Sequence, residues 1–151
     1  MMTKKTLYVD MDNVLVDFPS AFARLPENTV KAHQDDPDEI PGIFSLMDPV
    51  TGAVEAHALL SEMFDTYILS TAPWRNPSAW ANKLLWVQKH LGDLAHKRLI
   101  LSHHKNLNRG HFLVDDSKKN GADRFKGELI EFGSEGFPDW PAVTKYLRAR
   151  A

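Results

Sequence analysis

Short apolar runs alternate with longer amphipathic stretches along most of the chain. Residues 6–10 (TLYVD) and 67–70 (YILS) are compact apolar runs that predict buried strands. Similar runs predict three further strands, at 98–102, 111–115 and 127–132. The intervening patterns predict three helices, at 52–64, about 77–91 and 141–149. Strands that alternate with helices predict an α/β fold, a three-layer Rossmann-like sheet of mostly parallel strands.

The helix at about 77–91 has clear start and stop signals. Asn76 and Pro77 provide a capping residue and an initial proline, and Gly92 ends the helix. A shared apolar face is predicted for four side chains, those of Trp80, Leu84, Val87 and Leu91. Asp139 is predicted to cap the last helix in the same way.

Residues 17–48 differ from this pattern. They contain four prolines and an acidic run at 35–39, which predict short helices at about 18–25 and 27–34 and no strand. We therefore expect a single domain over 1–151, with a small helical cap inserted after the first strand at about 17–48.

Composition narrows the possible functions. The 151 residues carry a net charge of −2, and no basic stripe favours a nucleic-acid polymer as partner. There is no cysteine, which excludes thiolate nucleophiles and cysteine-based zinc sites. No apolar run resembles a signal peptide or a bilayer-spanning helix, so we expect a cytoplasmic protein without a membrane partner. The sequence leaves a homodimer open.

Polar residues follow the predicted strands at their carboxyl ends, which lie along the same edge of a parallel sheet. Asp10, Ser70-Thr71, Lys105 and Asp115-Asp116 come at or just after four strand ends, and ligands bind at this edge of such sheets. Close carboxylates repel one another unless a cation joins them. An all-oxygen ligand set favours Mg²⁺ together with a substrate phosphate.

These residue types are suited to phosphoryl transfer. Asp10 can attack phosphorus, and Asp12 can protonate the leaving oxygen and later activate water. The Ser70 hydroxyl and Lys105 can bind the phosphate. Simpler roles remain open: the two aspartates could cap a turn, and Thr71 could face the phosphate instead of Ser70. Lys105 could also be a solvated loop residue, with Lys118 or Lys119 in its place.

Four motifs in order carry a family resemblance. DMDNV (10–14), ILST (68–71), Lys105 and LVDD (113–116) resemble the motifs of the haloacid dehalogenase superfamily of phosphohydrolases. The resemblance covers nearly the whole chain. Further segments resemble the 5′(3′)-deoxyribonucleotidase type, namely DPVTGAVEA (48–56), STAPW (70–74) and the NGA that follows LVDD.

The resemblance implies a Mg²⁺-dependent hydrolase of small phosphate esters, most of all deoxyribonucleoside monophosphates. It implies Asp10 as nucleophile and metal ligand, and Asp12 as acid/base that also lends its backbone carbonyl to the metal. The remaining implied contacts are the phosphate residues Ser70, Thr71 and Lys105, the metal ligands Asp115 and Asp116, and the base-packing aromatic residues Phe18, Phe44 and Trp74.

Two departures from the family pattern stand out. Asn13 occupies a position where the family usually has Gly, and Ser117 one where members often have Arg. Two alternative functions remain open on the sequence. One is a phosphatase of another small phosphate ester, and the other is a non-enzymatic receiver-type module that accepts a phosphoryl group on Asp.

Overall fold

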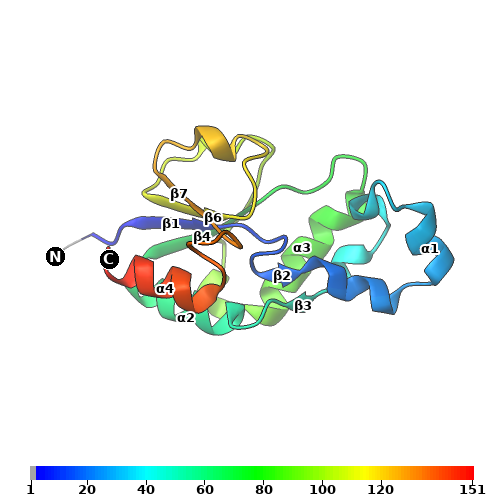
Figure 1. Ribbon diagram of the computed structural model, residues 1–151, viewed down its shortest axis with the longest axis horizontal. Coiled ribbons are helices and arrows are strands. Elements are labelled where there is room, and N and C mark those ends of the chain that lie inside the picture. The colour runs from blue at the N-terminus through cyan, green and yellow to red at the C-terminus, as the bar shows by residue number, and fades with distance from the viewer. Residues whose placement is uncertain (1–2) are drawn as a thin grey trace.

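The computed structural model, which describes residues 3–151, contains a five-stranded parallel sheet (Figure 1). The strand order is β5-β4-β1-β6-β7, so the first strand lies at the centre. The strands are β1 (Thr6–Val9), β4 (Asp65–Ser70), β5 (Leu99–Leu101), β6 (Phe112–Asp115) and β7 (Glu128–Glu131). All five predicted strands and the α/β fold class are confirmed.

The two faces of the sheet are covered differently. Leu7 and Val9 point to one face and join the main apolar core, to which three helices contribute, α2 (Ala53–Met63), α3 (Pro77–His90) and α4 (Trp140–Arg148). Tyr8 points to the other face, where it packs edge-on against Phe125. Short 3-10 helices cover this second face, η5 (Lys105–Leu107) and η6 (Ala122–Arg124), in the yellow segment above the strands in Figure 1.

Helix α4 fixes the turn that follows β1. Its predicted cap is confirmed, because the Asp139 side chain accepts a hydrogen bond from the Ala142 N–H at 3.0 Å. Trp140, at the start of the helix, is 1% exposed and donates from Nε1 to the Val14 carbonyl at 2.8 Å. A buried indole with a hydrogen-bond partner constrains its neighbours through packing and through the directional hydrogen bond. The β1 turn is therefore anchored from the far end of the chain.

The inserted segment is closed at its base by two very short antiparallel strands. These are β2 (Val16–Asp17) and β3 (Asp48–Pro49). The prediction that residues 17–48 contain no strand was therefore wrong at the two ends of that segment. A pair of two-residue strands is too short to leave a periodic signal in the sequence. Four short helices lie between them, η1 (Phe18–Arg24), α1 (Glu27–Ala32), η2 (Pro37–Glu39) and η3 (Ile43–Ser45).

The inserted segment is held against α3, on the right of Figure 1. The Asn76 side-chain amide donates to the carbonyls of Asp38 and Ile40, at 2.9 and 3.0 Å. Trp86 Nε1 donates to the Met47 carbonyl at 2.9 Å. Within residues 3–151, no helix has the length and apolarity that crossing a membrane requires.

This packing corrects the predicted apolar face of α3. Val87 and Leu91 are buried as predicted, but Trp80 and Leu84 are 37% and 46% exposed. The inward face instead carries Ala79, Lys83, Trp86 and Val87. The rotation of a helix about its axis depends on what covers it, and here the inserted segment covers the side that includes Lys83.

Candidate active site

The turn after β1 places two aspartates at one edge of the sheet. Asp10 continues the β1–β6 pairing, since its N–H donates to the Val114 carbonyl at 2.9 Å, and it is 5% exposed. The Met11 carbonyl accepts from the N–H groups of Val14, Leu15 and Val16, at 3.1, 2.8 and 2.9 Å. This tight turn puts Asp12 beside Asp10, with about a third of its side chain exposed.

Asn13 adopts the backbone conformation for which glycine is usual. Its φ is 61°, in the left-handed region, and Asn occupies that region more readily than most residues. Its side-chain oxygen accepts from the Phe18 N–H at 3.4 Å. The departure from the family pattern at this position is therefore compatible with the turn.

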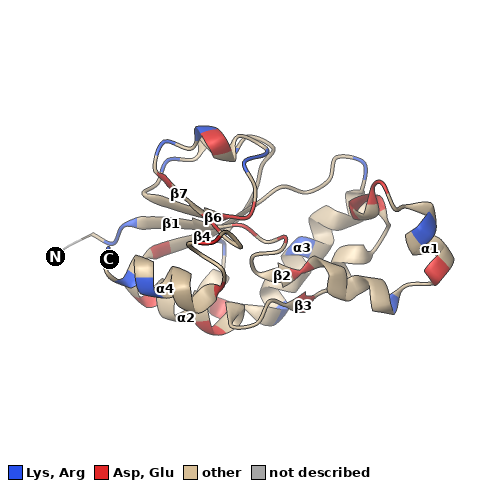
Figure 2. Cartoon of the chain, viewed as in Figure 1, with Lys and Arg blue, Asp and Glu red and all other residues tan. Residues whose placement is uncertain are grey.

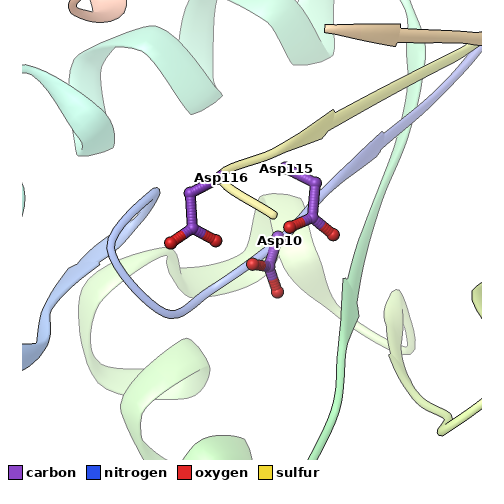
Figure 3. A group of neighbouring side chains, drawn as sticks. All are labelled: Asp10, Asp115 and Asp116. Atoms are coloured by element: carbon purple, nitrogen blue, oxygen red, sulfur yellow. The ribbon is translucent and has the colours of Figure 1, made fainter. Parts of the chain in front are cut away.

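Three carboxylates converge where β1 and β6 end (Figure 3). One oxygen each from Asp10, Asp115 and Asp116 lies within 4.8 Å of the others. Figure 2 shows this acidic edge as red ribbon at the ends of the two neighbouring strands. Parallel pairing of Val9 with Val114 explains the proximity, because it brings the two strand ends level.

Burial and mutual repulsion disfavour the charged forms of these carboxyls. Loss of solvation raises the pKa of Asp10 to about 7, with Lys105 opposing the shift and Asp115 adding to it. Loss of solvation and the nearby Asp10 charge raise the pKa of Asp116 to about 6, and burial also raises that of Asp115. A site that disfavours three adjacent negative charges is one that a bound cation would stabilise.

Lys105 lies inside this group. It is 3% exposed, and its Nζ donates to Asp10 Oδ1 at 3.0 Å and to Asp115 Oδ2 at 2.6 Å. Burial alone would lower its pKa, but the two carboxylates raise the pKa above its ordinary value. The structure therefore places the predicted lysine at the acidic edge, with both aspartates as partners.

A second buried lysine, Lys83, was not predicted. It extends from α3, is 0% exposed, and its Nζ donates to Ser70 Oγ at 2.7 Å and to Asp12 Oδ1 at 3.0 Å. The same ammonium group lies 4.5 Å from the centre of the Phe44 ring, within cation–π range. It thus joins the predicted acid/base, the predicted phosphate hydroxyl and the inserted segment.

A weak sequence signal for Lys83 existed. It lies four residues after Ala79 and four before Val87, so a lysine shares the face of apolar residues. On most helices such a lysine extends its stem along the surface and keeps its charge in water. A buried lysine differs from such a surface lysine by having polar partners inside the protein. The partners of Lys83, Asp12 and Ser70, are distant from it in sequence.

The two hydroxyls after β4 have different surroundings. Ser70 is fully buried and faces Lys83, whereas Thr71 Oγ1 donates to the Ser102 carbonyl at 2.7 Å. The Thr71 hydroxyl therefore connects the ends of β4 and β5. Of the two, Ser70 is the one that lies with the charged groups of the site.

The three predicted aromatic residues are not equivalent. Phe44 is 2% exposed and packs edge-on against Phe18, with ring centres 5.7 Å apart. Trp74 is 79% exposed and contacts His103 edge-on at 5.8 Å. The structure brings Phe18 and Phe44 together in the inserted segment and leaves Trp74 on the loop between β4 and α3.

Solved structures with similar backbones define the fold. A HAD-hydrolase, YfnB from Bacillus subtilis, solved bound to magnesium, matches with a TM-score of 0.66 over 97% of this chain and 99% of that one, at 11% identity. A haloacid dehalogenase-like family hydrolase from Xanthomonas campestris matches with a TM-score of 0.57 over 99% and 96%, at 10% identity. The fold is that of the haloacid dehalogenase-like hydrolases.

Sequence comparison gives the family. The profile of the 5′ nucleotidase, deoxy (pyrimidine), cytosolic type C proteins matches residues 25–138. A Vibrio phage KVP40 protein, assigned as a 5′(3′)-deoxyribonucleotidase, is 54% identical over 95% of this chain and 85% of its own length. A similarly assigned Bordetella pertussis protein is 33% identical over 73% of each chain. The chain belongs to this nucleotidase family, and it is a phosphoric monoester hydrolase, as predicted.

Proposed function

We propose that the protein hydrolyses deoxyribonucleoside monophosphates through an aspartyl-phosphate on Asp10, with Mg²⁺ as cofactor. The observation that carries this is the pairing of two aspartates on one turn. Asp10 faces two further carboxylates, while Asp12 faces Lys83 and, through it, Ser70. The substrate class follows the relatives, which include a human 5′(3′)-deoxyribonucleotidase of cytosolic type, 29% identical over 70% of this chain and 48% of its own length.

The first step forms a bond between an Asp10 carboxylate oxygen and phosphorus and breaks the bond between phosphorus and the nucleoside oxygen. Asp12 lies next in the turn and donates the proton that the leaving oxygen needs. In the second step, Asp12 accepts a proton from water, and that water attacks the phosphorus of the intermediate. The Asp10 carboxylate then leaves, and inorganic phosphate is released.

Phosphate binding falls to Ser70 and Lys83 in this proposal. Their side chains contact each other beside Asp12, and they offer a hydroxyl and a buried positive charge to phosphate oxygens. Thr71 and Lys105 were predicted for the same role. Their side-chain donors already contact the Ser102 carbonyl and two carboxylates, which supports an indirect contribution from both.

The acidic group suits Mg²⁺ in charge and in donor type. Three carboxylates and Lys105 sum to −2, which one divalent cation neutralises, and every donor is oxygen. We assign Asp10, the Asp12 carbonyl and Asp116 as direct ligands. Both oxygens of Asp115 already accept hydrogen bonds, from Lys105 and from the Ser117 N–H at 3.0 Å. When bound, the ion supplies charge neutralisation at the phosphoryl oxygens.

We assign residues 17–48 as a cap within a single domain over 1–151. The buried residues of this segment belong to the same apolar cluster as the sheet, which supports one cooperative unit. Within the cap, the partial burial of Phe18 supports its predicted role of packing on a nucleobase. The burial of Phe44 supports a role beneath Phe18, and the exposure of Trp74 supports contact at the outer rim.

Turnover of different substrates tests the proposed function. Purified protein with Mg²⁺ should hydrolyse dTMP and dUMP with a kcat/KM at least about tenfold above that for sugar phosphates. Equal rates on all esters would favour the alternative of a different small phosphate substrate. A long-lived phosphoprotein without turnover would favour the receiver-type alternative.

Mg²⁺ binding should strengthen as pH rises. Since the pKa values of Asp10 and Asp116 are raised to about 7 and about 6, both carboxyls hold protons near pH 5 and lose them by about pH 8. The stability that these protons give is present below the ordinary carboxyl pKa and is lost as pH rises through about 6 to 7. The metal-free protein therefore loses stability over that range, and Mg²⁺ should restore it.

Thermal unfolding with and without Mg²⁺ measures this effect. The Mg²⁺-induced rise in Tm should be larger at about pH 8 than at about pH 5, with an apparent affinity at least about tenfold higher. Asp116→Asn should lose most of the rise, whereas the exposed Asp123→Asn should keep it. A rise that is independent of pH would contradict carboxylate binding at this edge.

A further inference from the structure

Asn76 and Ser78, at the start of α3, tie the cap to that helix. We propose that these two residues position the inner stretch of the cap, residues 38–47, over Lys83, and that they thereby set the preference for substrates that carry a nucleobase. The inference rests on the proposed function. Both residues act through the cap, so they are positioning residues rather than catalytic ones.

The Asn76 side chain is buried, and both its donors and its acceptor oxygen are in use. It is 2% exposed, and its Nδ2 donates to the carbonyls of Asp38 and Ile40, at 2.9 and 3.0 Å. Its Oδ1 accepts from the Ser78 hydroxyl. The Ser78 Oγ in turn accepts from the Gly42 N–H at 2.9 Å. Because each partner in this network holds another, the two side chains and residues 38–42 form one unit.

The start of α3 does not require these side-chain contacts. Asn76 occupies the predicted cap position, but within residues 3–151 its side chain accepts no capping hydrogen bond from the helix backbone. The first turn is closed by the backbone instead, since the Ala79 N–H donates to the Asn76 carbonyl at 3.0 Å. Pro77, at the first helical position, needs no acceptor. The Asn76 amide is therefore available to hold the cap.

The same network fixes a tight turn in the cap. Gly42 has a φ of 80°, in the left-handed region that favours glycine. Its N–H is held by Ser78, and its carbonyl accepts from the hydroxyl and the N–H of Ser45, at 2.6 and 3.0 Å. Helix η3 begins directly after this turn and contains Phe44, which is 2% exposed. The position of the Phe44 ring therefore depends on where Gly42 is held.

Two further residues of α3 contact the inner stretch of the cap. The Lys83 ammonium lies 4.5 Å from the centre of the Phe44 ring, and Trp86 Nε1 donates to the Met47 carbonyl at 2.9 Å. Lys83 and Trp86 follow Asn76 by seven and ten positions, so all three lie on one side of the helix, the side that faces the cap in Figure 1. A shift of the cap away from α3 would therefore move Phe44 from the lysine that we assign to phosphate.

A nucleobase depends on the cap more than a phosphate group does. In the proposed function, the phosphate contacts the strand ends and Lys83, whereas the base packs on Phe18. The Phe18 ring packs edge-on against Phe44, with ring centres 5.7 Å apart. Loss of the Asn76–Ser78 network should therefore weaken the binding of a nucleotide. A sugar phosphate without a base should be unaffected, because it lacks the group that the cap contacts.

Steady-state kinetics of Asn76→Ala and Ser78→Ala on two matched substrates test the proposal. The substrates are dTMP and 2-deoxyribose 5-phosphate, which differ by the base. In each variant the KM for dTMP should rise about tenfold while kcat stays within about threefold, as expected when binding alone is lost. Both constants for the sugar phosphate should stay within about threefold of wild type.

Two comparisons sharpen the kinetic test. The double variant should be no worse than Asn76→Ala, because the two side chains belong to one network. Asn28→Ala is the matched control, since Asn28 is an exposed asparagine of the cap, in α1. It should keep the wild-type preference for dTMP. A control that loses the preference to the same degree would overturn the inference.

Amide hydrogen exchange gives a measurement that does not depend on turnover. Ser78→Ala removes the acceptor of the Gly42 N–H, so residues 38–47 should exchange at least about tenfold faster without substrate. The strands β1 and β6 should exchange as in wild type. Unchanged exchange of residues 38–47 in both variants would refute the positioning role.

The remaining outcomes are separable. A variant with lower Tm but an unchanged ratio of kcat/KM between dTMP and the sugar phosphate would overturn the inference, because the network would then serve stability alone. If Asn76→Ala does not fold, Ser78→Ala carries both measurements. If wild-type protein hydrolyses neither substrate, the proposed function fails before any variant is compared, and the substrate preference inferred for the network fails with it.

Discussion

Asp10→Asn will lower kcat by at least about 10³-fold, since an amide cannot act as the nucleophile that forms the phosphorus bond. The variant should remain folded. Burial raises the pKa of Asp10 to about 7, so the metal-free protein already tolerates an uncharged group at this position. Without Mg²⁺ at about pH 8, the Tm of the variant should equal or exceed that of wild type, because a disfavoured charge has been removed.

Single-turnover rates and thermal unfolding together check this expectation. Asp123→Asn, at an exposed position, is the control for a lost carboxylate outside the site. Full activity in Asp10→Asn would refute the aspartyl-phosphate mechanism. A variant that is inactive but also unfolded would not count as support, which is why Tm is measured on the same preparation.

Lys83→Met will lower kcat/KM by about 10²- to 10³-fold, the usual effect of removing one donor aimed at developing charge. Methionine retains most of the length of the side chain in a position that is 0% exposed, so packing against Phe44 is retained. The Ki for inorganic phosphate should rise at least about tenfold, because the cation beside Ser70 is lost.

Lys89→Met is the matched control, since Lys89 is an exposed lysine on the same helix. Steady-state kinetics with phosphate as competitive inhibitor measure both effects. A variant with lower kcat but unchanged phosphate affinity would contradict phosphate binding by Lys83.

The sequence predicted the acidic edge because the required chemistry leaves a recognisable order of residues. Asp10 and Asp115 each end an apolar run, and parallel strands place such ends at the same edge. Ser70 follows from the same rule. Strand positions were predictable for the related reason that strands buried on both faces are compact apolar runs.

The helices were less predictable in their rotation than in their position. The bounds of α3 were close to the prediction, because Asn76, Pro77 and Gly92 are local signals. The prediction that Trp80 and Leu84 lie on its buried face was wrong, because the buried face of this helix depends on where the inserted segment packs. The two-residue pair of β2 and β3 gave no local signal at all.

The sequence by itself determined where the candidate site lies: the two aspartates of the first turn, the second acidic pair and the fold that brings them together. These follow from local patterns, since strand order and strand-end residues are written along the chain. Only the tertiary structure decided how the lysines are divided. Lys83 reaches Asp12 across 71 positions and Lys105 reaches Asp10 across 95, so no local pattern records either contact. A buried lysine is defined by its distant partner, and partners are set by packing.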